Sequence, residues 1–350
     1  MQRNQRIDTM HKRAIRELTE KELGEWLAAQ KQPAFRLKQI LQWVNEKAIV
    51  SFDEMGNVPS QLRAALEKDF SFCAVCPVEK LCAEDQTVKW LSRLWDDATV
   101  ETVLIRAPER NTVCISTQVG CAVRCAFCES GRHGFVRNLS KAEIVDQVVL
   151  ASHEAGKIVD NVVVMGTGEP MHNFDNLVQA LNWLCDQEHG MGMSCRNITV
   201  STSGITNGIR RLADLQRPWN LAISLHAPDD NIRAQIIPAR HRHPIAEIIE
   251  ACKYYRQNTG RMVTFEYVLV SGLNDSEANA RALSTLAHEA HAKVNLIPCN
   301  NGSSRLKAPD KSTCDKFLAI LEHNGIQATI RHRKGDDILA ACGQLRANRK

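Results

Sequence analysis

Two hydrophobic periods divide the chain into regions of different secondary structure. Between residues 14 and 70, apolar side chains recur every three or four positions, with Gly and Pro between the groups, which is typical of short amphipathic helices. From about residue 112 onward, short β-branched runs alternate with segments of helical period. The runs, which are predicted strands, are TVCIST, NVVVMG, NITVSTSG, LAISLHA, MVTFEYVLV, KVNLIP and ATIRHR. Helices are predicted to begin after Ser140, Asn173, Ile205, Pro244 and Asp275.

This alternation predicts an α/β fold. Repeated strand–helix–strand units form a parallel sheet wrapped by helices, and about six of them make a closed or partly open barrel. We expect residues 111–350 to form this barrel, residues 1–70 a small helical domain, and residues 71–110 a connection of short strands and turns. Catalytic groups belong at the C-terminal ends of barrel strands. Four motifs fall there: GTGEP, STSG, SLHA and PCN.

The sequence predicts neither a membrane-spanning helix nor a secretion signal. No run of about 18 apolar residues is present, and the N-terminus MQRNQRIDTMHKRAIREL is charged and has no apolar signal core. We therefore expect a cytoplasmic protein with no membrane partner. The net charge of +4 permits nucleic-acid binding but does not by itself indicate it. The lysines and arginines between residues 21 and 47 suit either a solvated helix face or an RNA-contacting module.

A cluster of cysteines is the strongest chemical signal. The cytoplasm keeps thiols reduced, so the clustered members of the 13 cysteines point to metal ligation or catalysis. Cys121, Cys125 and Cys128 have the spacing C-x3-C-x2-C directly after a predicted strand. A structural zinc site needs four ligands, and His133 could be the fourth. A [4Fe–4S] cluster on three thiolates leaves one iron open for chemistry, and Phe127 before the last cysteine favours this interpretation.

The three-cysteine motif resembles the signature of radical S-adenosylmethionine (SAM) enzymes. Other segments resemble the RlmN/Cfr family of RNA adenosine methyltransferases from about residue 30 to 347, and FRLKQILQWVNEKAIVSFDEM resembles the family's small RNA-binding domain. The resemblance implies a partial (βα)6 radical SAM barrel with one [4Fe–4S] cluster on Cys121, Cys125 and Cys128. The segments are TQVGCAVRCAFC, GFVRNLSKAEIVDQV, NVVVMGTGEPMHNFDN, ITVSTSG, LAISLHAPDDNIRAQIIP, VNLIPCN and GDDILAACGQL.

The resemblance also implies three catalytic residues. Cys342 accepts a methyl group from a first SAM, and a second SAM converts it to a methylene radical that adds to adenine. Such chemistry suits carbon 2 of adenine, which is too electron-poor to attack SAM directly. Cys114 then attacks the sulfur of Cys342, which releases methylated RNA and leaves a disulfide for reduction. Glu101 matches the family's proposed proton acceptor.

The SAM contacts are likewise assigned by motif match. A glycine at a strand end lets a ligand approach the backbone, and a neighbouring carboxylate can bind the amino group of SAM. The motif GxGxxG is absent, so a Rossmann-type SAM site is not expected. The assigned residues are Gly168, Glu169, Ser201, Ser224, Leu225, His226 and Asn300.

The implied substrate is an adenosine of 23S ribosomal RNA, methylated at carbon 2, with transfer RNA as a second candidate. Such a base must be unstacked before reaction. The resemblance further implies a monomer that takes electrons from a donor such as a flavodoxin. Three alternatives stay open: carbon-8 methylation as in the Cfr branch, which GDDI before LAACGQL disfavours; a radical SAM enzyme with a non-RNA substrate, which would not need Cys342; and a zinc-binding RNA module without enzymatic activity.

Overall fold

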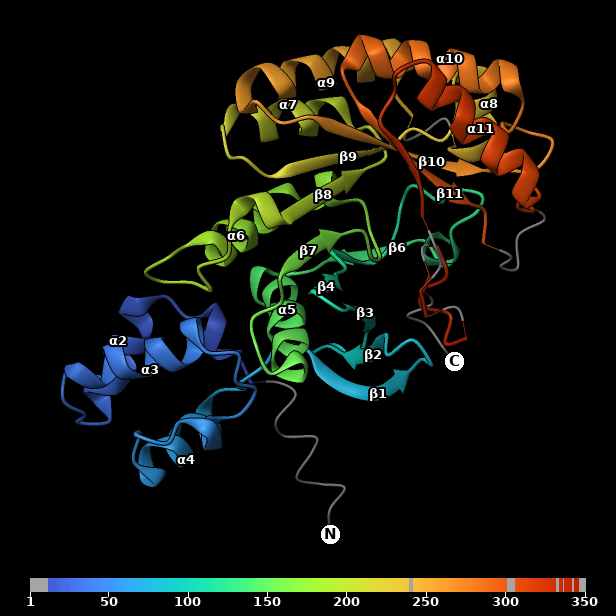
Figure 1. Cartoon of the computed structure of the whole chain (residues 1–350). Helices are drawn as coiled ribbons and strands as arrows, with labels where there is room; N and C mark the ends of the chain where they lie inside the picture. Colours follow the sequence, from blue (N-terminus) through green and yellow to red (C-terminus); the bar gives the residue numbers. More distant parts are fainter. Residues whose placement is uncertain are drawn as a thin grey trace.

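A helical domain precedes one large sheet in the computed structural model, which describes residues 12–238, 242–300, 306–331, 334–335, 337–341 and 343–345 (Figure 1). In the described part of the chain, none of the helices has the length and apolar composition needed to cross a bilayer.

The N-terminal domain has a hydrophobic core of its own. Its elements are η2 (Ile15–Glu17), α2 (Glu20–Ala29), α3 (Phe35–Glu46), η3 (Phe52–Glu54) and α4 (Ser60–Asp69). A capping box between Thr19 and Glu22 begins α2. The apolar positions spaced along these helices meet in one cluster, as their period predicts. The fully or largely buried members include Leu23, Leu27, Ile40, Val44, Met55, Leu62 and Leu66.

An antiparallel extension leads from this domain into the barrel. Strands β1 (Cys76–Cys82), β2 (Val88–Arg93), β3 (Thr99–Ala107) and β4 (Arg110–Cys114) form a meander. Strand β4 belongs to both parts, because it pairs antiparallel with β3 and parallel with the next strand of the barrel. The extension and the barrel are therefore one continuous sheet.

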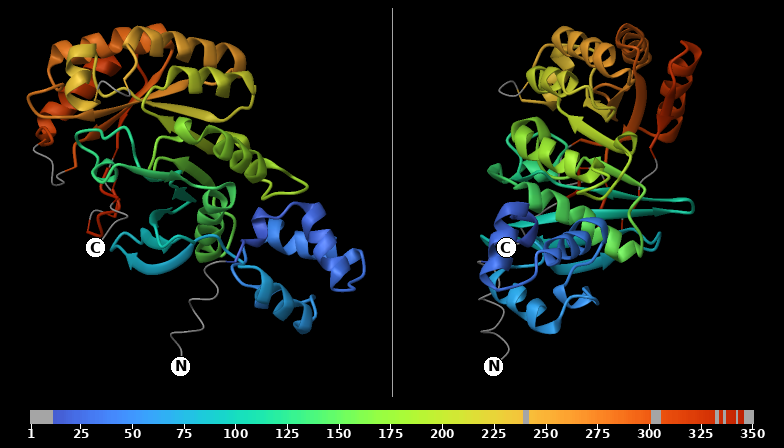
Figure 2. Two further views of the ribbon diagram at one scale, coloured as in Figure 1. Left: turned by 180° about the vertical axis from the view of Figure 1, so that it is seen from behind. Right: turned by 90° about the vertical axis from the view of Figure 1, so that its left-hand side faces the viewer.

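The parallel part is an open half-barrel, which is one of the two forms that the alternating pattern allows and the one that the family resemblance implies. Among the described residues the sheet has ten strands in the order β1-β2-β3-β4-β7-β8-β9-β10-β11-β12, so β1 and β12 are free edges. Its helices cover the outer face (Figures 1 and 2). The predicted helix starts are confirmed. The strands are β7 (Asn161–Val164), β8 (Ile198–Thr202), β9 (Asn220–Ser224), β10 (Val263–Leu269), β11 (Lys293–Pro298) and β12 (Ala328–Ile330). The helices are α5 (Lys141–Ala155), α6 (Phe174–Cys185), α7 (Thr206–Asp214), α8 (Asp230–Ile236), α9 (Ile245–Thr259), α10 (Glu277–Ala290) and α11 (Lys311–His323).

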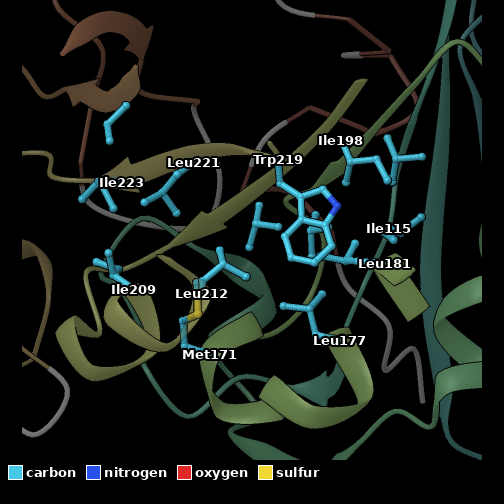
Figure 3. Packing of buried hydrophobic residues seen from close by; sticks show 14 of the residues in the cluster. Ile115, Met171, Leu177, Leu181, Ile198, Ile209, Leu212, Trp219, Leu221 and Ile223 are labelled. Atoms are coloured by element: carbon cyan, nitrogen blue, oxygen red, sulfur yellow. The ribbon is translucent and has the colours of Figure 1, made fainter. Parts of the chain in front are cut away.

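Shorter elements complete the structure near the strand ends. They are the hairpin β5 (Gln118–Gly120) and β6 (Phe135–Asn138), and the turns η4 (Glu129–Gly131), η5 (Pro170–Asn173) and η6 (Cys195–Asn197). The main core lies between the sheet and its covering helices, where Trp219 packs among aliphatic side chains from the strands and from α6 and α7 (Figure 3). The α/β class is confirmed. The domain boundaries at residues 70 and 110 stay a prediction.

A buried ion pair joins the helical domain to the barrel. The guanidinium of Arg16 lies 2.8 Å from the carboxylate of Asp146 on α5, and their side chains are 2% and 0% exposed. Arg16 also donates to the carbonyl of Val44 at 3.1 Å, and the other carboxylate oxygen of Asp146 accepts from the N–H of Ala74 at 2.5 Å. Burial raises the pKa of Asp146, against the opposing effect of Arg16. The pair therefore fixes the position of the domain at a cost in desolvation.

We expect Arg16→Met to lower the free energy of unfolding by about 3–5 kcal/mol, because it leaves a buried carboxylate without its cation. Adding Asp146→Asn should restore part of this loss, since the amide oxygen can still accept from Ala74. Urea unfolding measures both effects. Lys21→Ala, in an exposed pair with Glu25 at 3.8 Å, is the control and should change stability by less than about 1 kcal/mol. Equal stability of Arg16→Met and the control would contradict the assignment.

Candidate active site

The three clustered cysteines lie on the loop between β5 and β6. The two ends of this loop are held together, because the N–H of Cys121 donates to the carbonyl of Gly134 at 3.1 Å. Gly120 has a φ of +72°, and a Cβ there would lie 1.8 Å from the carbonyl oxygen of Gly134. Only glycine permits this approach. Further along, the N–H of Cys128 donates to the carbonyl of Cys125 at 3.0 Å and closes a turn.

All three cysteines line one cavity of about 150 Å³. Burial raises the pKa of Cys121 to about 12, and the nearby charge of Cys128 adds to this effect. Burial, and then the charges of the other two thiolates, raises the pKa of Cys125 well above its usual range. Thiols that oppose one another's ionisation need bound metal to become thiolates together. This donor set therefore fits a metal centre.

The zinc alternative is disfavoured by the position of its fourth ligand. His133 is exposed and is not among the residues that line the cavity. In the described part of the chain, no three His, Cys, Asp or Glu side chains converge closely enough to hold a single metal ion. A cubane cluster is wider than one ion, so thiols too far apart for zinc can still bind it.

The C-terminal ends of the parallel strands form the other wall of this cavity. The predicted residues come from β8 and β9 themselves and from the segments that follow β7, β9 and β11. Leu225 is buried and is not among the lining residues; its N–H donates to the carbonyl of Glu266 at 3.1 Å. The fold thus brings most of the predicted SAM contacts to face the three cysteines. Those that line the cavity are Gly168, Glu169, Ser201, Ser224, His226 and Asn300.

The carboxylate of Glu169 is oriented by backbone donors from two loops. Its Oε1 accepts from the N–H of Met171 at 3.1 Å, and its Oε2 accepts from the N–H of Ser203 at 2.7 Å. The preceding Gly168 has a φ of +114°, and a Cβ there would lie 2.7 Å from the Cβ of Gln118. A buried carboxylate held in this way can bind an ammonium group.

His226 is a neutral ring in the cavity wall. Its ring packs edge-to-face on Phe127, with centroids 4.9 Å apart. Burial, and then the charge of Arg233, lowers the pKa of His226 to about 3. Its Nδ1 accepts from the N–H of Val268 at 3.2 Å, and this hydrogen bond assigns the proton of the neutral ring to Nε2. His226 can therefore act as a hydrogen-bond donor, but not as a cation, near pH 7.

Cys114 and the C-terminal segment line a second, smaller cavity of about 60 Å³. It is lined by Cys114, Cys128, Ala341 and Gly343, among other residues. The segment is fastened to the cysteine loop, because the N–H of Glu129 donates to the carbonyl of Gly343 at 2.8 Å. Cys342 lies outside the described residues. Its two neighbours in the chain nevertheless share this cavity with Cys114.

Glu101 lies on the same face of the sheet as Cys114. Strand β3 pairs with β4 so that Val103 is opposite Cys114, and Glu101 is two residues before Val103. The Nζ of Lys89 is 3.3 Å from the carboxylate of Glu101, with side chains 5% and 6% exposed. Lys89 also donates to the carbonyl of Leu339 at 3.1 Å. This buried ion pair, whose cation the sequence did not indicate, therefore touches the C-terminal segment.

Two further charged residues of the site were missed from the sequence. Glu266 on β10 lines the main cavity and accepts from the side-chain amide of Asn295 at 2.7 Å. Burial raises its pKa, against the opposing charge of Arg331. The only signal was a carboxylate inside the apolar run MVTFEYVLV. Such a residue in a parallel strand is buried on one face or the other, and only the sheet decides which.

Arg233 is the second missed residue. It is fully buried on α8 and donates to the carbonyls of Leu225 at 3.1 Å, Ser203 at 2.6 Å and His243 at 2.9 Å. Burial lowers its pKa to about 10, with opposing contributions from negative charge at Asp230 and Cys125. Its cation therefore ties the loops after β8 and β9 together beside the cysteine loop.

Models of two known families match the two parts of the chain. The model of the radical SAM superfamily matches residues 115–282, and that of the ribosomal RNA large subunit methyltransferase N-terminal domain matches residues 14–71. A probable dual-specificity RNA methyltransferase RlmN from Alkaliphilus oremlandii is 43% identical over 96% of this chain and 98% of its own. The RlmN relative from Symbiobacterium thermophilum is also 43% identical, over 93% of this chain and 89% of its own. The crystal structure of a radical SAM methyltransferase from Sphaerobacter thermophilus is similar with a TM-score of 0.90 and 44% identity, over 96% of this chain and all of its own.

Replacement of Gly168 by alanine should disrupt the cavity wall. The φ of +114° is strained for any L side chain, and the added Cβ would press on Gln118, so we expect a loss of about 2 kcal/mol or more in stability. Gly56→Ala is the matched control, because no atom lies within 4 Å of its added Cβ; it should be neutral or slightly stabilising. Denaturant unfolding compares the two. If both variants were equally stable, the constraint at Gly168 would be absent.

Proposed function

Because the chain belongs to the RlmN family of radical SAM RNA methyltransferases, we propose that it methylates carbon 2 of an adenosine in 23S ribosomal RNA. As a member of this family, it is an enzyme that uses a [4Fe–4S] cluster and SAM. Its relatives are named dual-specificity RNA methyltransferases, which supports a second RNA substrate, and we propose transfer RNA for this role. We further propose a cytoplasmic monomer supplied with electrons by a flavodoxin-like donor.

The cofactor residues in this proposal are those that share the main cavity. Cys121, Cys125 and Cys128 would hold the cluster, which supplies the single electron that cleaves SAM. Glu169 would bind the amino group of SAM, since its carboxylate is buried and held by two backbone N–H groups. The neutral ring of His226 would donate a hydrogen bond without adding charge. Gly168, Ser201, Ser224, the backbone of Leu225 and Asn300 would complete the contacts.

The methyl group would travel on a cysteine. We propose that the sulfur of Cys342 carries the methyl carbon that becomes bonded to carbon 2 of the adenine. The thiolate of Cys114 would then attack this sulfur, so that a Cys114–Cys342 disulfide forms as the carbon–sulfur bond to the product breaks. Glu101 would accept the proton that carbon 2 loses. Its buried partner Lys89 would keep this carboxylate in place beneath the C-terminal segment.

One observation supports the role proposed for Cys342 in methyl transfer. Cys114, Cys128 of the cluster loop and the neighbours of Cys342 in the chain line a single cavity. A radical SAM enzyme without a cysteine-borne methyl group has no need for this arrangement. The juxtaposition therefore favours methyl transfer through Cys342 over action on a non-RNA substrate.

The carbon that is methylated can be identified directly. We expect 23S ribosomal RNA from a strain lacking the enzyme to gain 2-methyladenosine after incubation with the reconstituted protein, SAM and a one-electron reductant. A nucleoside digest analysed by mass spectrometry measures this product. Detection of 8-methyladenosine without 2-methyladenosine would instead assign the chain to carbon-8 chemistry.

Replacement of Cys114 should trap the protein on its RNA. With Cys114→Ala, nothing attacks the sulfur of Cys342, so we expect a covalent protein–RNA band on a denaturing gel. The double variant Cys114→Ala/Cys342→Ala should lack this band. Cys314→Ala, which removes a buried packing thiol, is the control and should turn over normally. An adduct that persists without Cys342 would refute its role as carrier.

A further inference from the structure

The N-terminal end of the half-barrel holds a cavity that the site described above leaves unused. Its volume of about 660 Å³ lies within the roughly 300–1,000 Å³ of ligand-binding clefts. We call it the lower bowl. Part of its lining comes from residues that begin or precede strands, opposite the ends that face the cysteine loop. Among them are Arg110, which begins β4, and Asn161, Asn197, Asn220, Arg261 and Lys293 at or just before the beginnings of β7 to β11.

The lining of the lower bowl is strongly basic. Arg110, Arg261, Lys293, Arg331 and Lys334 contribute positive charge, and Glu266 is the only carboxylate among its described lining residues. Arg110 and Lys293 form no ion pair with any residue that the structure describes. A concave surface that concentrates charge of one sign attracts ligands of the opposite sign. The bowl is therefore suited to a polyanion.

Arg261 supplies an unsatisfied donor. Its Nε is buried and has no hydrogen-bond partner among the described atoms. One terminal nitrogen donates to the side-chain oxygen of Asn220, whose amide in turn donates to the carbonyl of Arg196 at 2.6 Å. This chain fixes the orientation of the guanidinium. A buried donor left without an acceptor is costly, and an anionic oxygen in the bowl would satisfy it.

The lower bowl is connected to the reaction site. Met165 and Arg331 line the bowl, the main cavity and the small cavity of Cys114 alike. The guanidinium of Arg331 lies 4.0 Å from the sulfur of Met165, so the three spaces meet at this contact. Glu266 is likewise shared by the bowl and the main cavity. A strand of RNA in the bowl would thus pass directly below the groups that react.

We propose that the lower bowl binds the phosphates next to the target adenosine, through Arg110, Arg261 and Lys293. The proposal rests on the proposed function, because it takes RNA as the ligand. The bowl is a concave surface at one end of the half-barrel and suits a single strand, which is also the form in which an adenine can be unstacked. The amides of Asn161 and Asn197 suit sugar hydroxyls, which position the strand without reading its sequence.

The test compares two triple variants of the full-length reconstituted enzyme. Arg110→Gln/Arg261→Gln/Lys293→Gln neutralises the bowl. Lys253→Gln/Arg281→Gln/Lys316→Gln removes the same charge from the outer helices α9, α10 and α11. The probe is a fluorescein-labelled 23S ribosomal RNA hairpin with the target adenosine in its loop, and anisotropy is measured between 50 and 200 mM salt. Melting curves and SAM binding establish that each variant is folded.

We expect the bowl variant to weaken RNA binding by about tenfold. The slope of the logarithm of the binding constant against the logarithm of salt concentration should become shallower by about 2, because each of the three lost single-strand phosphate contacts accounts for about 0.7. The outer-face variant should change both quantities much less, and SAM binding should be unaffected in either. Single Arg110→Gln, at an exposed side chain, gives the same test if the triple variant fails to fold.

The outcomes separate the two proposals. Unchanged RNA affinity and methylation in the bowl variant would overturn the bowl as an RNA site and leave the proposed function intact. Equal losses in both triple variants would also overturn it, because the effect would then come from net charge alone. Failure of the wild-type enzyme to bind or methylate RNA would overturn both. Binding of inorganic phosphate that the bowl variant loses, with RNA affinity unchanged, would overturn the bowl as an RNA site and assign it to a small anion instead.

Discussion

The whole site depends on keeping three desolvated thiols together. Burial raises the pKa of Cys121 and Cys125, and the charge of Cys128 raises both further, so the thiols oppose one another's ionisation. Their loop is fixed by contacts from three directions: its own far end, the end of α8 through Ala126 N–H to the carbonyl of Ile236 at 2.9 Å, and the C-terminal segment through Glu129. Because the loop has little regular structure, these distant contacts rather than local propensity determine its shape.

The same contacts place the cysteine loop beside Cys114 and the C-terminal segment. Strand β4 ends at Cys114, a short segment containing β5 leads from there into the cysteine loop, and the C-terminal segment returns to lie on that loop. The antiparallel extension adds Glu101 and Lys89 to the same edge. An open sheet makes this possible, because β4 can pair on one side with the extension and on the other with the barrel. A closed barrel would leave no place for the extension beside β4.

Charge is distributed over this framework in two ways. Buried pairs such as Arg16 with Asp146 fix the position of one part relative to another and cost desolvation. Arg110 and Lys293 in the lower bowl instead form no ion pair with a described residue, and the guanidinium of Arg233 donates to backbone carbonyls. These groups leave positive potential in and around the barrel. The second arrangement favours an enzyme that binds RNA and ionises several thiols, because both the RNA and the thiolates are negatively charged.

The sequence by itself determined the element order, the cysteine triad and the motifs at the strand ends. These depend on local period and spacing, so the runs from TVCIST to ATIRHR and the helix starts after Ser140 and Pro244 could be predicted. It could not indicate Lys89 as partner of Glu101, Glu266 in the cavity wall, or Arg233 buried beside the cysteine loop. A charged residue in an apolar stretch has no local signature of its partner. Only the tertiary structure decides which strands are neighbours, which face each side chain occupies, and therefore which charges meet.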